Sequence, residues 1–260
     1  MQDNVGSCEI PEYLSSAESK IGYNSGETFK NRQVKYAAIN GMAIFEGDII
    51  LGTVEEEERI SKENEKLPPD QLRSIAASGQ GLRWPDGIIP FTIENNLPNQ
   101  ERVMDAIGQW EKLTFIKFVR HTNEIDFVTF RRERKGDVCA SSHIGMAGGQ
   151  QFITLIDSCR AGAVMHEIGH VLGLWHEHSI EDRNKFVRIV KANIRPGSAY
   201  QFEQQITDGD DVGEYDYCSI MHYGRFALCR RQQCPTPPCP CIGPTIEVLQ
   251  PSLPCSGQIG

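Results

Sequence analysis

Between residues 84 and 171, apolar positions recur with the two periods that distinguish strands from helices. Strand-like runs cover four stretches: 88–93, 115–119, 125–130 and 151–156. Residues 99–113 instead place apolar side chains three or four positions apart, which predicts an amphipathic helix. Its buried face is expected to consist of Val103, Ala106, Ile107, Trp110 and Leu113. With a second helix expected after Arg160, this order predicts an α+β domain with an irregular C-terminal half.

The first 73 residues form a separate, acidic segment. They hold 14 acidic and 8 basic residues and so carry −6 of the formal net charge of −9. The run Glu55–Glu58 favours a solvated, poorly ordered face. The stretch 36–51 is more apolar, and within it Gly47 lets the backbone bend sharply and expose the Asp48 carboxylate. By itself this stretch is an ordinary turn.

Composition narrows the classes of protein that fit the chain. A length of 260 residues, with 39% hydrophobic and 23% charged residues, suits one large or two modest folded domains. The net negative charge argues against a nucleic-acid partner, because non-specific binding to phosphates needs a basic surface. No run of 18 or more apolar residues is present, so no membrane span is expected.

The cysteine content indicates an oxidising compartment, because such usage is unusual in a cytosolic enzyme. The first residues have neither the basic nor the apolar region of a secretory signal. We therefore expect a secreted protein whose leader is removed or not included. The nine cysteines are Cys8, Cys139, Cys159, Cys218, Cys229, Cys234, Cys239, Cys241 and Cys255.

The stretch 165–177 carries the clearest chemistry. His166 and His170 stand four residues apart, so on a helix they lie on one face and can bind one metal ion. Glu167, beside the first histidine, can remove a proton from a water molecule at that metal. Gly173 favours a turn that returns His176 as a third ligand. Three protein ligands leave a fourth position open, as in a catalytic zinc site.

A His-Glu-x-x-His motif alone is equally compatible with a surface helix that binds nothing. The glycine and the third histidine at these offsets complete the metzincin signature, which makes a zinc hydrolase the leading hypothesis.

The run 166–178, together with Asp182-Arg183, Asn193 and the run 219–223, resembles the astacin family of metzincin metallopeptidases. Glu177, directly after the third histidine, is the residue that distinguishes this family. The resemblance covers roughly residues 84–260 and extends into the N-terminal segment. It implies a zincin-like fold, with a twisted mixed sheet and the active-site helix in an N-terminal lobe. The irregular C-terminal lobe is expected to contain a Met-turn.

The resemblance also implies roles for individual residues. His166, His170 and His176 correspond to the zinc ligands and Glu167 to the general base. Met221 corresponds to the methionine beneath the zinc. Tyr223 corresponds to a tyrosine that can ligate zinc and swing away to stabilise the transition state; the alternative is a buried aromatic residue whose hydroxyl is hydrogen-bonded.

The N-terminal segment resembles an astacin propeptide. Phe45-x-Gly47-Asp48 corresponds to the aspartate switch, in which the carboxylate fills the open zinc position and keeps the enzyme latent. Residues 1–73 are then a propeptide and residues 74–260 the catalytic domain. An activating protease is expected to cleave between about Arg73 and Gly81. Glu177 would then bind the new N-terminus through water.

Cys139 and Cys159 match a family disulfide before the active-site helix, whereas Phe115 stands where another family cysteine is expected. We predict local disulfides rather than a second metal site for the remaining C-terminal cysteines, and a free thiol for Cys8. The chain ends at Gly260, where the family continues with a final helix.

The predicted function is therefore that of a zinc-dependent endopeptidase, with one Zn²⁺ per chain, made as a zymogen and acting on peptide or protein substrates. One alternative is a zinc hydrolase of non-peptide amides, which Glu177 and Tyr223 argue against. Another is an inactive extracellular binding protein that holds zinc, which the intact Glu167 argues against.

Overall fold

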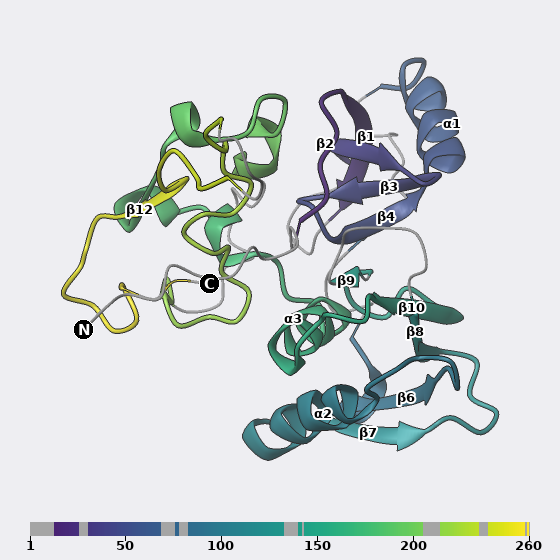
Figure 1. Cartoon of the computed structure of the whole chain (residues 1–260). Coiled ribbons are helices and arrows are strands. Elements are labelled where there is room, and N and C mark those ends of the chain that lie inside the picture. The colour runs from purple at the N-terminus through teal and green to yellow at the C-terminus, as the bar shows by residue number, and fades with distance from the viewer. Residues whose placement is uncertain are drawn as a thin grey trace.

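The computed structural model describes residues 13–25, 31–68, 76–77, 83–132, 140–141, 143–204, 214–233, 239–257 and 259. Three bodies of structure are visible (Figure 1): an N-terminal sheet with one helix, a second sheet with two helices, and a C-terminal half of turns and short strands. In the part that is described, no helix has the length and apolar character needed to cross a membrane.

The N-terminal segment folds into a sheet of its own. Its strands are β1 (Ser19–Ser25), β2 (Arg32–Ile39), β3 (Met42–Phe45), β4 (Ile49–Thr53) and β5 (Ala76–Ala77). β1 to β4 pair antiparallel in succession, and β5 pairs in parallel with β1. Asn40 and Gly41, both at positive φ, make the tight turn between β2 and β3. β5 lies inside the predicted cleavage window, most of which falls outside the described residues.

The acidic run is helical, so the prediction of a poorly ordered face was wrong. It begins α1 (Val54–Asn64), whose N-terminus is closed by a capping box between Thr53 and Glu56. Glu57 is buried, and its Oε2 accepts a hydrogen bond from the backbone N–H of Tyr23 in β1. Acidic side chains in a first turn are favourable because they face the positive end of the helix dipole.

The second sheet follows the predicted strands closely. It contains β6 (Ile88–Ile93), β7 (Lys117–Arg120), β8 (Phe127–Arg132), β9 (Ala140–Ser141) and β10 (Gln150–Leu155), in the order β7-β6-β8-β10-β9. The pairings among β6, β7, β8 and β10 are parallel, whereas β9 lies antiparallel at the edge. The sheet is thus mixed, as predicted.

Two helices, α2 (Glu101–Leu113) and α3 (Ala161–Val171), pack against each other and share one apolar core with this sheet. Trp84 and Trp110 donate their indole N–H groups to the carbonyls of Val171 and Met165, which ties both tryptophans to α3. Leu113 was predicted on the buried face but is 71% exposed, because α2 ends there.

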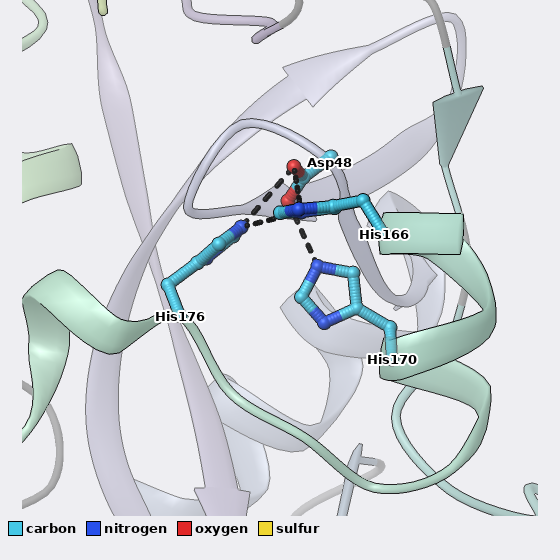
Figure 2. Close-up of side chains that lie close together, drawn as sticks. All are labelled: Asp48, His166, His170 and His176. Carbon is cyan, nitrogen blue, oxygen red and sulfur yellow. Dashed lines mark hydrogen bonds and ion pairs between the residues drawn. The ribbon is translucent and has the colours of Figure 1, made fainter. Parts of the chain in front are cut away.

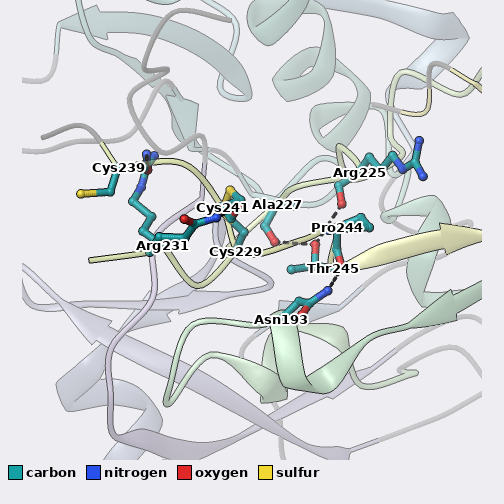
Figure 3. The surroundings of a disulfide bond; sticks show 10 residues. Asn193, Arg225, Ala227, Cys229, Arg231, Cys239, Cys241, Pro244 and Thr245 are labelled. Atoms are coloured by element: carbon teal, nitrogen blue, oxygen red, sulfur yellow. Dashed lines mark hydrogen bonds between the residues drawn. A yellow bond between two sulfur atoms is a disulfide. The ribbon is translucent and has the colours of Figure 1, made fainter. Parts of the chain in front are cut away.

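The C-terminal half is held by short pairings and disulfides, as its composition predicted. β11 (Val187–Ile189) pairs antiparallel with β12 (Ile246–Val248), and cystines join Cys218 to Cys255 and Cys229 to Cys241. Around the second cystine, hydrogen bonds from Asn193 and Thr245 link neighbouring turns (Figure 3). Cys239 is also disulfide-bonded. Short 3-10 turns complete the fold at Pro85–Gly87, Glu177–Ser179, Arg183–Lys185, Lys191–Asn193 and Ala199–Phe202.

Candidate metal centre

The polar side chains of helix α3 are clustered in its C-terminal half. His166, Glu167 and His170 are all buried on this otherwise apolar helix. The helix stops as predicted at Gly173, whose φ of 98° is the left-handed conformation that glycine adopts at low cost. The N–H of Gly173 donates to the His170 carbonyl, and the chain turns back so that His176 enters the same site.

Each imidazole is held through Nδ1 by an oxygen atom. His166 Nδ1 lies 2.7 Å from the Ile220 carbonyl, and His170 Nδ1 lies 2.8 Å from the Leu174 carbonyl. His176 Nδ1 lies 2.8 Å from Oε2 of a carboxylate, that of Glu46. Because Nδ1 is held by these oxygens, Nε2 of each ring points toward the centre, the orientation that metal-binding histidines require.

The fourth group comes from the N-terminal segment. The three-residue hairpin loop between β3 and β4 carries Asp48 on to the histidines (Figure 2). Asp48 Oδ2 lies 3.2 Å from Nε2 of His176 and 3.3 Å from Nε2 of His166. Asp48 Oδ1 lies 3.6 Å from Nε2 of His170. Gly47 makes this possible with a φ of 86°, and a side chain there would collide with Tyr13.

These four side chains fit a zinc ion. Their ligand atoms all lie within 4.8 Å of one another, and every one of the four side chains is buried. A tetrahedral ion with bonds of about 2.0–2.1 Å separates its ligands by about 3.3 Å, close to the distances between Asp48 and the histidines. His170 Nε2 and Asp48 Oδ1 face each other at 3.6 Å, which is beyond direct hydrogen-bond distance and leaves both atoms able to bind a metal.

The charges of the site favour a cation next to Asp48. Burial raises the pKa of Asp48, but the positive charge of His176 and hydrogen bonds with the histidines outweigh it, so the pKa lies well below its usual range. Burial lowers the pKa of His176, yet the carboxylates of Asp48 and Glu46 raise it to about 9. Burial lowers the pKa of His170 to about 4, which keeps this ring neutral and able to coordinate.

Met221, the predicted residue of a Met-turn, packs against the helix that carries His166 and His170. Its side chain is buried against Gly169 in α3, where a methyl group would overlap Sδ. The backbone of the same turn holds both sides of the site. The Ile220 carbonyl binds His166, and the Met221 carbonyl accepts the N–H of Glu177.

Tyr223 is fully buried, and its ring lies 4.7 Å from that of His176. Its ring stacks on His178 with centroids 3.7 Å apart, and the Tyr13 ring from the N-terminal segment lies 3.9 Å away. Its hydroxyl donates to the main-chain carbonyl of Glu46. Burial and the carboxylates of Asp48 and Glu46 raise the pKa of Tyr223 well above its usual range, so the hydroxyl keeps its proton.

The remaining predicted residues are placed only in part. Oε1 of Glu177 accepts the N–H of Asp216 at 2.7 Å. Cys159 is buried just before α3, but Cys139 lies outside the described residues, as does Cys8, so the predicted pairing and the predicted free thiol stay predictions. Phe115, at the position where a cysteine was expected, is 79% exposed.

Sequence reasoning missed Glu46 and Gly169 as parts of this site. Glu46 is fully buried, and charged residues are seldom buried without a partner. Its partner is His176. Gly169 carried a signal, because a glycine inside a helix is unfavourable unless something packs closely on it. Nothing in the local sequence marks Glu46.

Comparison with known proteins gives consistent results. Residues 77–239 match the profile of the peptidase family described as Astacin. Bone morphogenetic protein 1 of Xenopus laevis is 39% identical over 152 residues, which are 56% of this chain and 21% of that protein. Tolloid-like protein 2 of Mus musculus is 40% identical over 165 residues, which are 62% of this chain and 16% of that protein. The chain thus spans about a fifth or less of the length of these relatives.

A solved structure shares the fold. High choriolytic enzyme 1, a hatching enzyme zinc-protease from Oryzias latipes, superposes with a TM-score of 0.55 at 32% identity. The match covers 67% of this chain and 84% of that one. The similarity confirms the predicted α+β, zincin-like architecture.

Proposed function

The chain belongs to the astacin family of zinc metalloendopeptidases, and on that premise we propose that it is the latent form of such an enzyme, blocked by its own N-terminal segment. Zinc is the metal of this family, and the cluster of three histidines and Asp48 fits it. Each of the other site residues then has a role in one reaction, the hydrolysis of a peptide bond in a peptide or protein substrate.

His166, His170 and His176 would hold the ion through Nε2. When bound, zinc polarises a carbonyl group and lowers the pKa of a water molecule from about 15.7 to about 7. Glu167 accepts a proton from the attacking water and returns it to the leaving amine, a task that its buried position next to His166 supports. Tyr223 donates its hydroxyl hydrogen to the carbonyl oxygen as negative charge develops there.

The substrate is proposed to lie extended along the edge of the second sheet. β9 is an edge strand of this sheet. A substrate peptide would pair with the chain at this edge, near residues 141–145. This path ends close to α3, because the N–H of Gly145 donates to the His170 carbonyl at 2.8 Å. The edge therefore leads an extended chain toward the histidines.

One observation carries the proposal of latency: the Asp48 carboxylate lies against all three histidines at 3.2–3.6 Å. A carboxylate is a competent zinc ligand, and in this position it excludes the water that hydrolysis needs. The Glu46 carbonyl also holds the hydroxyl of Tyr223. The N-terminal segment thus engages the metal position and the tyrosine together.

Release of the block requires an activating protease. We place the boundary between propeptide and catalytic domain at residues 73–81, and the family match, which begins at residue 77, supports this position. Glu177 is proposed to bind the new N-terminus after cleavage. The disulfides of the C-terminal half support a secreted protein, because such bonds persist in oxidising compartments.

The test uses the uncleaved chain with Asp48→Ala. We expect it to hydrolyse quenched fluorescent peptides without processing, whereas the parent chain is silent until cleaved. The matched control is the double variant Asp48→Ala, Glu167→Gln, which should bind zinc but lose activity by roughly 10²–10⁴-fold, the usual contribution of a general base. An uncleaved Asp48→Ala chain that binds zinc and stays silent would refute latency through this residue. Robust hydrolysis by the double variant would refute the role of Glu167.

A further inference from the structure

Glu46 contacts His176 at Nδ1, the ring nitrogen that does not face Asp48. Its side chain is fully buried, with Oε2 accepting from Nδ1 of His176 at 2.8 Å. Its other oxygen, Oε1, accepts from the hydroxyl of Ser179. Both carboxylate oxygens therefore have partners, and both partners belong to the domain that carries the histidines.

The backbone of Glu46 is in a conformation that side chains seldom adopt. Its φ is 45°, in the left-handed region where glycine and asparagine are tolerated best. A turn that needed only its shape would be less strained with either of those residues. The hydrogen bonds of the carboxylate offset the unfavourable backbone, which indicates that the side chain has a function of its own.

His176 is also the one metal-binding histidine of the three whose Nδ1 depends on the N-terminal segment. The partners of His166 and His170 are carbonyls of Ile220 and Leu174, which stay with the catalytic domain. Loss of the N-terminal segment would remove the partner of His176 together with Asp48. The segment therefore supplies one group on each side of this ring.

We propose that Glu46 is a positioning residue that orients His176 and strengthens its bond to zinc, so that the N-terminal segment retains the metal in the latent protein as well as blocking the site. This inference rests on the proposed latent zinc enzyme. A carboxylate that accepts from the far nitrogen of a metal-binding imidazole fixes the tautomer and raises the basicity of the coordinating nitrogen. In the proposed scheme Glu46 leaves with the N-terminal segment before substrate is hydrolysed, so its effect is on metal binding and not on chemistry.

The experiment measures the rate at which the uncleaved, zinc-loaded chain loses zinc to an excess of a chromogenic chelator. Glu46→Asn keeps a residue that tolerates positive φ but removes the carboxylate from His176. Losing such a partner usually lowers metal affinity about 10–100-fold, and we expect this loss to appear as zinc release that is faster by about the same factor. Glu46→Gln keeps an acceptor without the charge and should accelerate release toward the lower end of that range. Glu55→Gln, an exposed glutamate of α1, is the control and should release zinc at the parent rate.

Thermal unfolding of each variant shows whether the hairpin is intact. With the melting temperature retained, an unchanged release rate in Glu46→Asn would overturn the proposal. If Glu46→Asn lowers the melting temperature, Glu46→Gln decides, because its side chain has nearly the same size and an unchanged rate there also overturns the proposal.

The Asp48→Ala assay separates this inference from the proposed latency. Activity of the uncleaved Asp48→Ala chain, combined with parent-like zinc release from both Glu46 variants, would leave latency standing and refute only the role of Glu46. A silent Asp48→Ala chain combined with fast zinc release from the Glu46 variants would refute the switch and support the role of Glu46.

Discussion

Gly169 is the residue at which the metal-binding helix and the Met221 turn meet. A methyl group at this position would overlap Sδ of Met221, whereas one at Gly162 on the same helix would meet nothing within 4 Å. Met221 cannot move far, because its own carbonyl and that of Ile220 hold Glu177 and His166. The close approach therefore requires glycine.

We predict that Gly169→Ala destabilises the chain by about 1–3 kcal/mol, the usual cost of overpacking a core, despite the better helix propensity of alanine. The matched variant Gly162→Ala should be neutral or stabilising by up to about 1 kcal/mol. Chemical unfolding of both variants against the parent chain measures the difference. Equal stabilisation by the two alanines would show that Met221 does not press on the helix.

The histidines and the buried carboxylates differ in how far the sequence could identify them. His166, His170 and His176 were predictable because one helix and one glycine turn bring them together within 11 residues. Asp48 was predictable only through its resemblance to a known motif, since its partners are far along the chain. Glu46 was not predictable, because its partner His176 lies 130 positions away and no local pattern links them.

At the scale of elements, α1 contains a buried acid. Among the described residues, Oε1 of Glu57 has no hydrogen-bond partner, and only the N–H of Tyr23 binds its other oxygen. Burial, partly offset by that hydrogen bond, raises the pKa of Glu57 to about 7. Because the folded pKa lies above the unfolded value of 4.5, the folded segment binds the proton more tightly.

The stability that Glu57 contributes is therefore present in full below about pH 4.5 and is lost as the pH rises through about 7. We predict that Glu57→Gln, which stays neutral, makes the chain more stable than the parent at pH 8, with a much smaller difference at pH 5. Urea unfolding midpoints at both pH values measure this, with the exposed Glu55→Gln as control. A parent-like decline in stability between pH 5 and pH 8 in Glu57→Gln would contradict the account.

The elements that the sequence predicted best are those with a strong apolar period. β6 has the predicted bounds, and α2 differs by two residues at its start, because their apolar positions face one core. The N-terminal strands were not predicted, because the high acidic charge of this segment conceals the apolar pattern of its strands. Two local signals were nevertheless present there: the Asn40-Gly41 hairpin turn and the capping box from Thr53 to Glu56.

At the scale of the whole molecule, the N-terminal segment is attached to the rest of the chain by more than its metal contact. Phe45 packs edge-on against Trp175 with ring centroids 5.9 Å apart. Farther from the histidines along the chain, the Leu14 carbonyl accepts from the Gln201 side chain, and Lys35 pairs with Glu203 at 2.7 Å. The Lys35–Glu203 ion pair is exposed and stabilises little, so the buried contacts at the metal centre, around Trp175 and at Gln201 carry most of the attachment.

The central claim is that the attached N-terminal segment, and not a lack of zinc, keeps the site silent. The most direct measurement follows one preparation before and after limited proteolysis between residues 73 and 81. Peptide hydrolysis and zinc content are determined on the same samples. Our account predicts about one zinc per chain at both stages, with hydrolysis only after cleavage and separation of the segment. Equal hydrolysis before and after cleavage, or a gain that follows zinc uptake, would contradict it.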